Sequence, residues 1–132
     1  MSTRPAVYLL VTLDTKAAEA AYVKQRILDA GVPVVLVDTG CIGEPGTPAD
    51  IPREAVFEAA GTTLAVARAK GDRGEAVIAA SKGATNLVLK AYAEGTLAAV
   101  ASLGGGGGTS IGTAAMRALP LGVPKVMVST LA

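Results

Sequence analysis

Two short apolar segments separated by a helical pattern constrain the fold of this chain most strongly. Residues 6–11 are continuously apolar and rich in β-forming types, and residues 34–37 form a second such run. Runs of this kind are typical of strands buried on both faces, as in a parallel sheet. Between them, apolar residues recur at the spacing of one helix face, at Ala20, Val23, Ile27 and Ala30. The pattern predicts a βαβ unit with a right-handed crossover.

The remainder of the chain predicts several helices and two more strands. The residue types that begin helices suggest Asp50 as the cap of a short helix ending near Ala60, and Thr62 or Thr63 as the cap of another. Asp72, Arg73 and Glu75 are interpreted as the charged start of the longest helix. The expected elements are a loop over 39–52, a long helix over 74–94, strands over 97–103 and 125–128, and a helix between these strands.

These elements predict a single α/β domain of 132 residues. Strand one pairs with strand two through the first helix, and strand three most simply occupies the free side of strand one. The expected fold is a three-layer, Rossmann-like domain with a parallel sheet of about four strands in the order 2-1-3-4. Ligands of such sheets bind where the strand order reverses, which here lies between strands one and three.

Five consecutive glycines, Gly104, Gly105, Gly106, Gly107 and Gly108, follow the third strand. Glycine allows positive φ and close approach of a ligand, so successive N–H groups can form a nest for an anion. Thr109 and Ser110 come next and could cap the following helix or bond the anion. That helix would add free N–H donors. The spacing fits neither a Walker A loop nor the usual dinucleotide fingerprint. The run predicts a phosphate site, with a ligand-free turn as the alternative.

The turn after strand one, from Thr12 to Lys16, would meet the glycines at this edge. Lys16 could neutralise a phosphate, and Thr12 and Thr15 could donate to it. Asp14 would repel a phosphate unless it caps the helix or holds magnesium. Further candidates at strand ends are Asp38, which could accept from ribose hydroxyls or form a turn, and Ser129, which could touch the ligand or end its strand.

Composition excludes several classes of protein. Twelve basic and eleven acidic residues give a net charge of +1, and only 3% of residues are aromatic, so binding to nucleic acid is not expected. The chain has one cysteine, Cys41, and no histidine, which argues against disulfides and Cys/His zinc sites. No signal core or membrane-length apolar run is present. We therefore expect a cytoplasmic protein with no metal site built from its own side chains.

Several stretches together resemble one family, the largely uncharacterised proteins that include the tomato mosaic virus resistance protein. The matching stretches are residues 12–16, 37–40 with 43–45, 71–76, 102–109, 114–120 and 122–130. The resemblance implies an ATP-binding, Rossmann-like domain that forms the first part of a longer nucleotide-binding module. It also implies that a second domain or chain completes this module. The virus-resistance member binds a viral replication protein, a role not carried over here.

The sequence thus predicts a domain that binds ATP or another nucleotide, with magnesium as a companion ion. One alternative is a half-site of a multidomain enzyme acting on a phosphorylated small molecule. Another is a self-assembly module without a ligand, and a homo-oligomer is expected in either case. No residue stands out as a catalytic base, so the sequence leaves open whether the protein is an enzyme.

Overall fold

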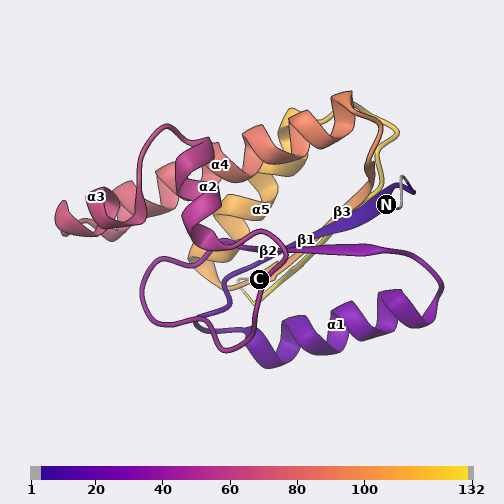
Figure 1. Cartoon of the computed structure of the whole chain (residues 1–132), viewed down its shortest axis with the longest axis horizontal. Helices are drawn as coiled ribbons and strands as arrows, with labels where there is room; N and C mark the ends of the chain where they lie inside the picture. The colour runs from indigo at the N-terminus through magenta and orange to yellow at the C-terminus, as the bar shows by residue number, and fades with distance from the viewer. Residues whose placement is uncertain (1–3, 131–132) are drawn as a thin grey trace.

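A parallel sheet of four strands in the order β2-β1-β3-β4 forms the centre of the molecule (Figure 1). The computed structural model describes residues 4–130. The strands are β1 (Ala6–Val11), β2 (Val34–Asp38), β3 (Leu97–Gly104) and β4 (Lys125–Ser129). All three pairings are parallel, so every strand ends at the same edge. The predicted fold class and strand order are confirmed.

Helices cover both faces of this sheet. On one face lies α1 (Ala17–Asp29), while α2 (Arg53–Ala59), α4 (Arg73–Ala93) and α5 (Gly106–Ala118) cover the other (Figure 1). The short α3 (Leu64–Ala69) lies beyond α2, at one end of the molecule. The chain steps in one direction from β1 to β2 and in the opposite direction from β3 to β4. Right-handed crossovers therefore place α1 and α5 on opposite faces.

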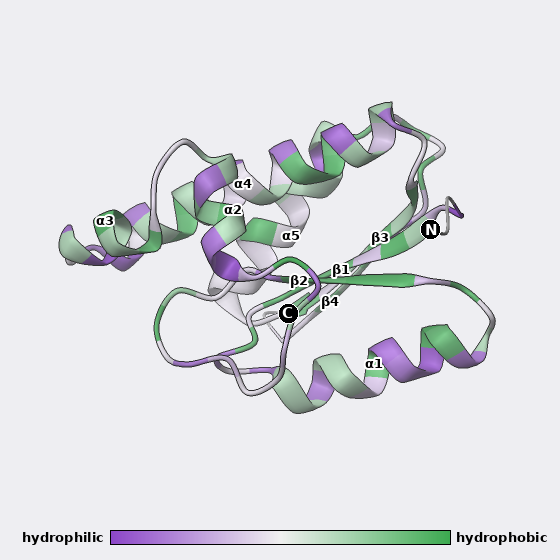
Figure 2. Ribbon diagram, in the orientation of Figure 1, coloured by the Kyte–Doolittle hydropathy of each residue, from purple (hydrophilic) through white to green (hydrophobic). Residues whose placement is uncertain are grey.

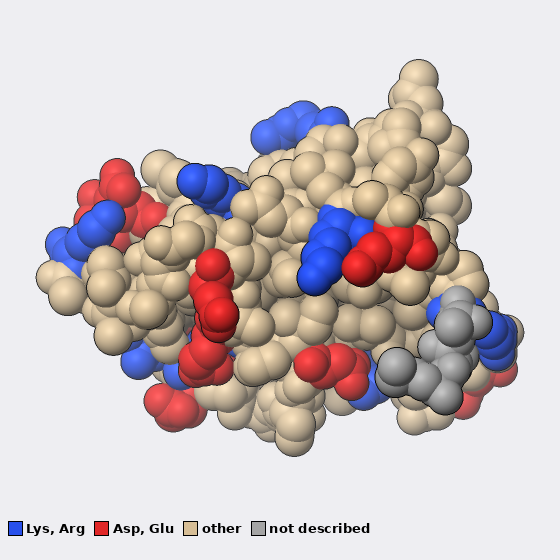
Figure 3. All heavy atoms as spheres, turned by 45° about the horizontal axis from the view of Figure 1, so that its top comes forward, with Lys and Arg blue, Asp and Glu red and all other residues tan. Residues whose placement is uncertain are grey.

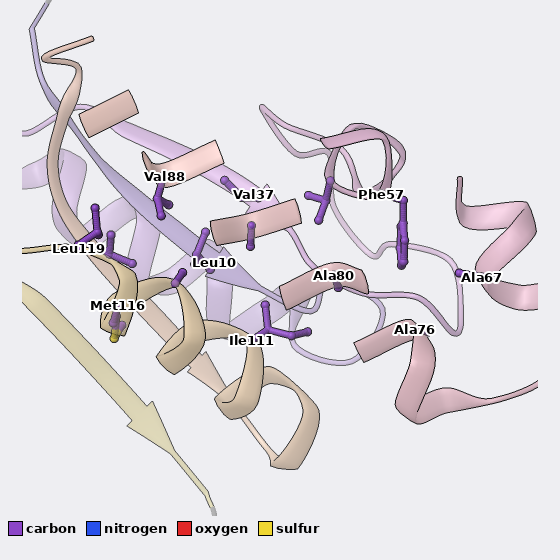
Figure 4. Packing of buried hydrophobic residues seen from close by; sticks show 14 residues of the cluster. Leu10, Val37, Phe57, Ala67, Ala76, Ala80, Val88, Ile111, Met116 and Leu119 are labelled. Carbon is purple, nitrogen blue, oxygen red and sulfur yellow. The ribbon is translucent and has the colours of Figure 1, made fainter. Parts of the chain in front are cut away.

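The alternation of side chains along β1 divides the core into two clusters. Leu9 and Val11 pack beneath α1, while Leu10 points into the larger cluster under α2, α4 and α5. Figure 4 shows residues of the larger cluster, among them Phe57 and Ile111, converging from helices and strands. Both clusters are built mainly from aliphatic residues. In Figure 2, hydrophobic and hydrophilic residues alternate along α1, which packs on the sheet with only part of its surface.

Two of the predicted helix caps are present and one is wrong. The Asp72 carboxylate accepts from the Gly74 N–H at 2.8 Å, and the Thr63 hydroxyl accepts from the Val66 N–H at 3.1 Å. Asp50 does not cap α2, which begins after Pro52 without a side-chain cap. Its carboxylate instead accepts from the Leu36 N–H at 2.7 Å. Asp50 thus accepts a hydrogen bond from a backbone N–H of β2. The residue preferences of helix caps do not predict this contact, because it joins segments far apart in the sequence.

The glycine run also differs from the prediction. It is not a loop, because β3 continues through Gly104 and α5 already begins at Gly106. None of its residues has positive φ. The need for glycine is one of space, since a Cβ on Gly104 would lie 2.7 Å from the Cα of Gly108. One turn later, a Cβ on Gly112 would overlap the side chain of Ser102. Small residues therefore let α5 lie directly on β3.

The chain carries nearly equal numbers of basic and acidic side chains, twelve and eleven. On the face in Figure 3, basic and acidic groups alternate among wide uncharged areas. Across residues 4–130, the helices are all too short or too polar to span a membrane.

We expect Gly83→Ala to lower the free energy of unfolding by about 1–3 kcal/mol, because overpacking forces the backbone to shift. A Cβ at this position in α4 would overlap the carbonyl oxygen of Val56 in α2. Urea unfolding measures the change. The matched control is Gly74→Ala in the same helix, whose Cβ would approach the Asp72 carboxylate only to 3.2 Å. Equal stability of both variants would contradict close packing of α2 on α4.

Candidate functional site

A cleft of about 230 Å³ lies at the carboxyl edge of the sheet, where the turns after β1 and β3 meet. The switch point predicted from the strand order is therefore hollowed. Two segments far apart in sequence line it together, residues 12–16 and the start of α5. Of the candidate residues, those that line the cleft are Thr12, Asp14, Thr15, Lys16, Gly105, Gly106, Gly107 and Gly108.

The turn after β1 is closed by its own backbone. The carbonyl oxygen of Thr12 accepts from the N–H groups of Thr15 at 3.2 Å and Lys16 at 2.9 Å. The hydroxyls of Thr12 and Thr15 lie 2.9 Å apart, and one donates a hydrogen bond to the other. Lys16 occupies the N-cap position of α1. This turn holds two hydroxyls and one ammonium group at the rim of the cleft.

The first turn of α5 supplies the opposite wall. Gly105 is its N-cap, and its carbonyl oxygen accepts from the Thr109 N–H at 2.9 Å. The N–H groups of the first helical turn have no acceptor within the helix, and they carry the positive end of the helix dipole. Gly106, Gly107 and Gly108 form this turn and line the cleft. Gly106 is exposed and Gly107 is half-buried, so their backbone is accessible to a ligand, while Gly108 is buried.

One alternative from the sequence, that Asp14 caps α1, is wrong, because α1 has no side-chain cap. Its Oδ2 accepts from the N–H groups of Ile42 at 3.0 Å and Gly43 at 3.1 Å. These residues follow β2, so the carboxylate joins the turn after β1 to the loop after β2. Gly40 lies against it, because a Cβ there would be 2.8 Å from Asp14 Oδ1. The acid thus has a structural role in shaping the cleft floor.

Two arginines hold the same loop through its carbonyl groups. Arg68 donates from Nε to the Cys41 oxygen at 3.1 Å and from Nη2 to the Ile42 oxygen at 3.0 Å. Arg53, which is 4% exposed, donates to the Gly43 oxygen and lies 3.5 Å from Glu44. Charge-assisted bonds of this kind are the stronger ones in proteins. The loop from Cys41 to Gly43 is therefore fixed from three directions.

Five candidate residues lie outside the lining of the cleft. Asp38 is buried, and its Oδ1 accepts from the N–H groups of Gly40 at 2.9 Å and Leu13 at 3.2 Å. The Thr109 hydroxyl lies 2.8 Å from that of Ser129, a contact that joins α5 to β4. Ser110 is exposed on α5, and Gly104 is buried at the end of β3.

Several residues that line the cleft were not predicted for this site. They are Thr39, Gly40, Cys41, Ile42, Arg73, Val77 and Ile111. Arg73 had been interpreted only as part of a charged helix start, and nothing in its local sequence indicates that α4 begins beside the cleft. Burial, followed by the charge of Asp14, raises the pKa of the Cys41 thiol. Cys41 therefore stays protonated at neutral pH and is a poor nucleophile.

Within residues 4–130, acidic side chains and the cysteine do not gather in groups of three that could hold a metal ion. Among the residues that line the cleft, Asp14 is the one carboxylate. A magnesium ion would thus need most of its oxygen ligands from water and a bound phosphate chain, the arrangement usual for Mg²⁺ with nucleotides.

The fold and the cleft define an α/β domain of Rossmann-like build with a cleft at its switch point. The chain belongs to the uncharacterised protein family UPF0261, whose N-terminal domain it matches over residues 5–132. This finding confirms the family resemblance seen in the sequence.

Relatives of the chain include bacterial and plant proteins. A UPF0261 protein of Clostridium tetani is 40% identical over 126 residues, which are 96% of this chain and 31% of that protein. A UPF0261 protein of Rhizobium meliloti is 42% identical over 126 residues, which are again 96% of this chain and 31% of that protein. The tomato protein named ToMV susceptible protein tm-1(GCR26) is 32% identical over 99% of this chain and 19% of its own length. The chain therefore spans less than a third of these relatives.

Burial, opposed by the hydrogen bonds from Gly40 and Leu13, raises the pKa of Asp38 above its ordinary 3.8. The folded state then binds the proton more tightly than the unfolded state, so this contribution to stability is full below pH 3.8 and is lost as pH rises through the folded pKa. We expect Asp38→Asn, which cannot ionise, to gain stability relative to wild type as pH rises from below 3.8 to neutral. Urea unfolding across this range measures the difference, and a difference that shrinks with pH would contradict the assignment.

Proposed function

We propose that this domain binds the phosphate groups of a nucleotide, with ATP as the leading candidate, in the cleft between the turns after β1 and β3. One observation carries the proposal: the first turn of α5 and the turn from Thr12 to Lys16 line the same cleft. Both sit at helix N-termini, where backbone N–H groups and the helix dipole favour an anion. The family resemblance in the sequence is what favours ATP among phosphate-bearing ligands.

The charges around the cleft support an anionic ligand. Lys16 and Arg73 both line it, one from each side of the switch point. Asp14 is the opposing charge, but its Oδ2 already accepts two backbone N–H groups. Those dipoles offset part of its charge and lower the repulsion that a phosphate would meet. Each hydrogen bond to a charged phosphate oxygen contributes about 1.5–3 kcal/mol, so a few bonds from glycine amides are enough for binding.

The size of the cleft indicates which part of a nucleotide it holds. A volume of about 230 Å³ lies below the range of roughly 300–1,000 Å³ typical of sites that enclose a whole ligand. The phosphates would lie over the glycine turn, and the apolar side chains of Ile42, Val77 and Ile111 would face the adjoining part of the ligand. In a longer protein, a second domain would cover the remainder. Magnesium would be held by the phosphates, with Asp14 as the nearest protein ligand.

The proposal is for binding, with any catalysis supplied from outside this domain. The Cys41 thiol, with its raised pKa, is not an activated nucleophile. Asp14 is engaged with the loop after β2. The cleft residues of this chain would orient phosphates and exclude water from one side of them. The enzyme half-site weighed in the sequence analysis is thus the extension of this proposal to a multidomain protein.

Replacing the two cations tests the phosphate contact. We expect Lys16→Ala and Arg73→Ala each to weaken ATP binding by about 10- to 100-fold, the loss of one charge-assisted bond. Adenosine, which has no phosphate, should bind the variants and wild type equally. Isothermal titration calorimetry with both ligands makes the comparison. The matched control is Lys82→Ala, a cation of α4 that lies outside the cleft lining.

Equal losses for ATP and adenosine would argue against a phosphate contact at these side chains. No ATP binding by the wild-type chain, at concentrations where its fold is intact by circular dichroism, would reject the proposal for this domain alone.

A further inference from the structure

The two edge strands of the sheet, β2 and β4, differ in whether another segment of the chain covers them. The edge at β2 is covered by residues 50 and 51, where the N–H groups of Asp50 and Ile51 donate to the Leu36 oxygen and Asp38 donates to the Ile51 oxygen. An isolated bridge joins Val37 to Ile51. At β4, no strand of residues 4–130 lies on the outer side. Exposed strand edges invite pairing with another chain unless they are guarded.

The usual guards are missing from β4. Its sequence, Lys-Val-Met-Val-Ser, has no proline, and its pairing with β3 runs without a register shift. Its one charged side chain, Lys125, is drawn back over the preceding turn, where Nζ donates to the oxygens of Leu119 at 3.3 Å and Pro120 at 3.0 Å. Val126 and Val128 are 59% and 58% exposed. This edge is straight and apolar, as in strands that pair between chains.

The apolar surface continues from β4 toward α1. A groove of about 500 Å³ between α1 and strands β3 and β4 is lined by Tyr22, Val23, Leu103 and Val128, among others. Tyr22 is 68% exposed. On the opposite face, Met127 packs under α5, against Gly112. The helix that covers this side of the sheet, α1, packs mainly on β1 and β2. The α1 side of β4 thus lacks a covering layer within residues 4–130.

We propose that β4 pairs with β4 of a second copy of this chain, antiparallel and about a twofold axis at Met127. Pro124 and Thr130 direct their backbone groups to β3, with bonds to Val100 and Gly104. Strand alternation then directs the N–H and C=O of Lys125 and Met127 outward. Met127 would exchange both hydrogen bonds with Met127 of the copy, as residues directly opposite in an antiparallel ladder do.

This register is self-complementary in its side chains. Val126 of one copy lies opposite Val128 of the other, so four valines form one patch on the α1 side of the joined sheet. Lys125 lies opposite Ser129, which keeps the two lysines apart. With the axis at Val126 or Val128, outward-directed residues would still face each other, but only three of the five residues of β4 would lie opposite β4 of the copy. The axis at Met127 therefore gives the longest ladder. The symmetric contact uses the same surface on both copies, as twofold dimers require.

The dimer would join two sheets into one. The cleft would stay accessible, because it lies over the turns after β1 and β3 and no residue of β4 lines it. The inference therefore goes beyond the proposed function and does not depend on it.

Charge variants at the two valines test both the surface and its register. Light scattering after gel filtration, from about 5 to about 500 µM, should show a wild-type dimer. The double variant V126K/V128K places like charges opposite each other in both pairs and should raise the dissociation constant by about 10- to 100-fold. In V126K/V128E each lysine faces a glutamate of the copy, so the dimer should return and weaken with salt.

The matched control is Ile78→Lys, a 63% exposed apolar residue of α4, which should leave the dimer unchanged. Circular dichroism confirms that each variant is folded. If the wild-type chain is a monomer at every concentration, the proposal is wrong, and any partner of the β4 edge is a different polypeptide. A V126K/V128K variant that still forms a dimer would show that β4 is not the interface. A V126K/V128E variant that stays monomeric would contradict the antiparallel register.

Discussion

The parallel pairing of β1 with β3 determines where the cleft of this protein lies. Val11 lies beside Leu103 in that pairing, and the two strands end at the same edge of the sheet. The turns that follow them lead into helices on opposite faces, so neither helix covers the gap between the turns. The cleft is a consequence of this topology, and the residues within it could change without removing it.

The glycines of α5 make this arrangement possible at close range. Gly104 and Gly112 allow the helix to lie on β3, where a Cβ would overlap its neighbours. The same absence of side chains brings the backbone of the first helical turn to the wall of the cleft. A single sequence feature therefore serves both packing and the proposed binding of an anion. The loop after β2, held by Asp14, Arg53 and Arg68, forms a third wall whose position is fixed before any ligand arrives. Such preorganisation lowers the conformational entropy that the loop would lose when a ligand binds.

Much of the fold could be predicted because it depends on local patterns. The apolar run of β1, the helical spacing of α1 and the cap at Asp72 each follow from neighbouring residues. The start of α5 could not be predicted this way, because glycine has a low helix propensity and packing on β3 overrides it. The roles of Asp14 and Asp50 could not be predicted either. Both resemble helix caps in the sequence, but their carboxylates accept from backbone N–H groups of distant segments. Arg73 and Arg68 reach the cleft and its loop through tertiary contacts that sequence spacing does not encode.

The central claim, that main-chain N–H groups at the start of α5 hold a phosphate, is tested most directly by nuclear magnetic resonance of the ¹⁵N-labelled chain titrated with ATP and magnesium. The account predicts that the amide signals of Gly106, Gly107 and Gly108 shift most, together with Lys16 and Arg73, and saturate with one affinity. The largest shifts at β4 or along α1, or shifts of these glycines that adenosine reproduces in full, would contradict it.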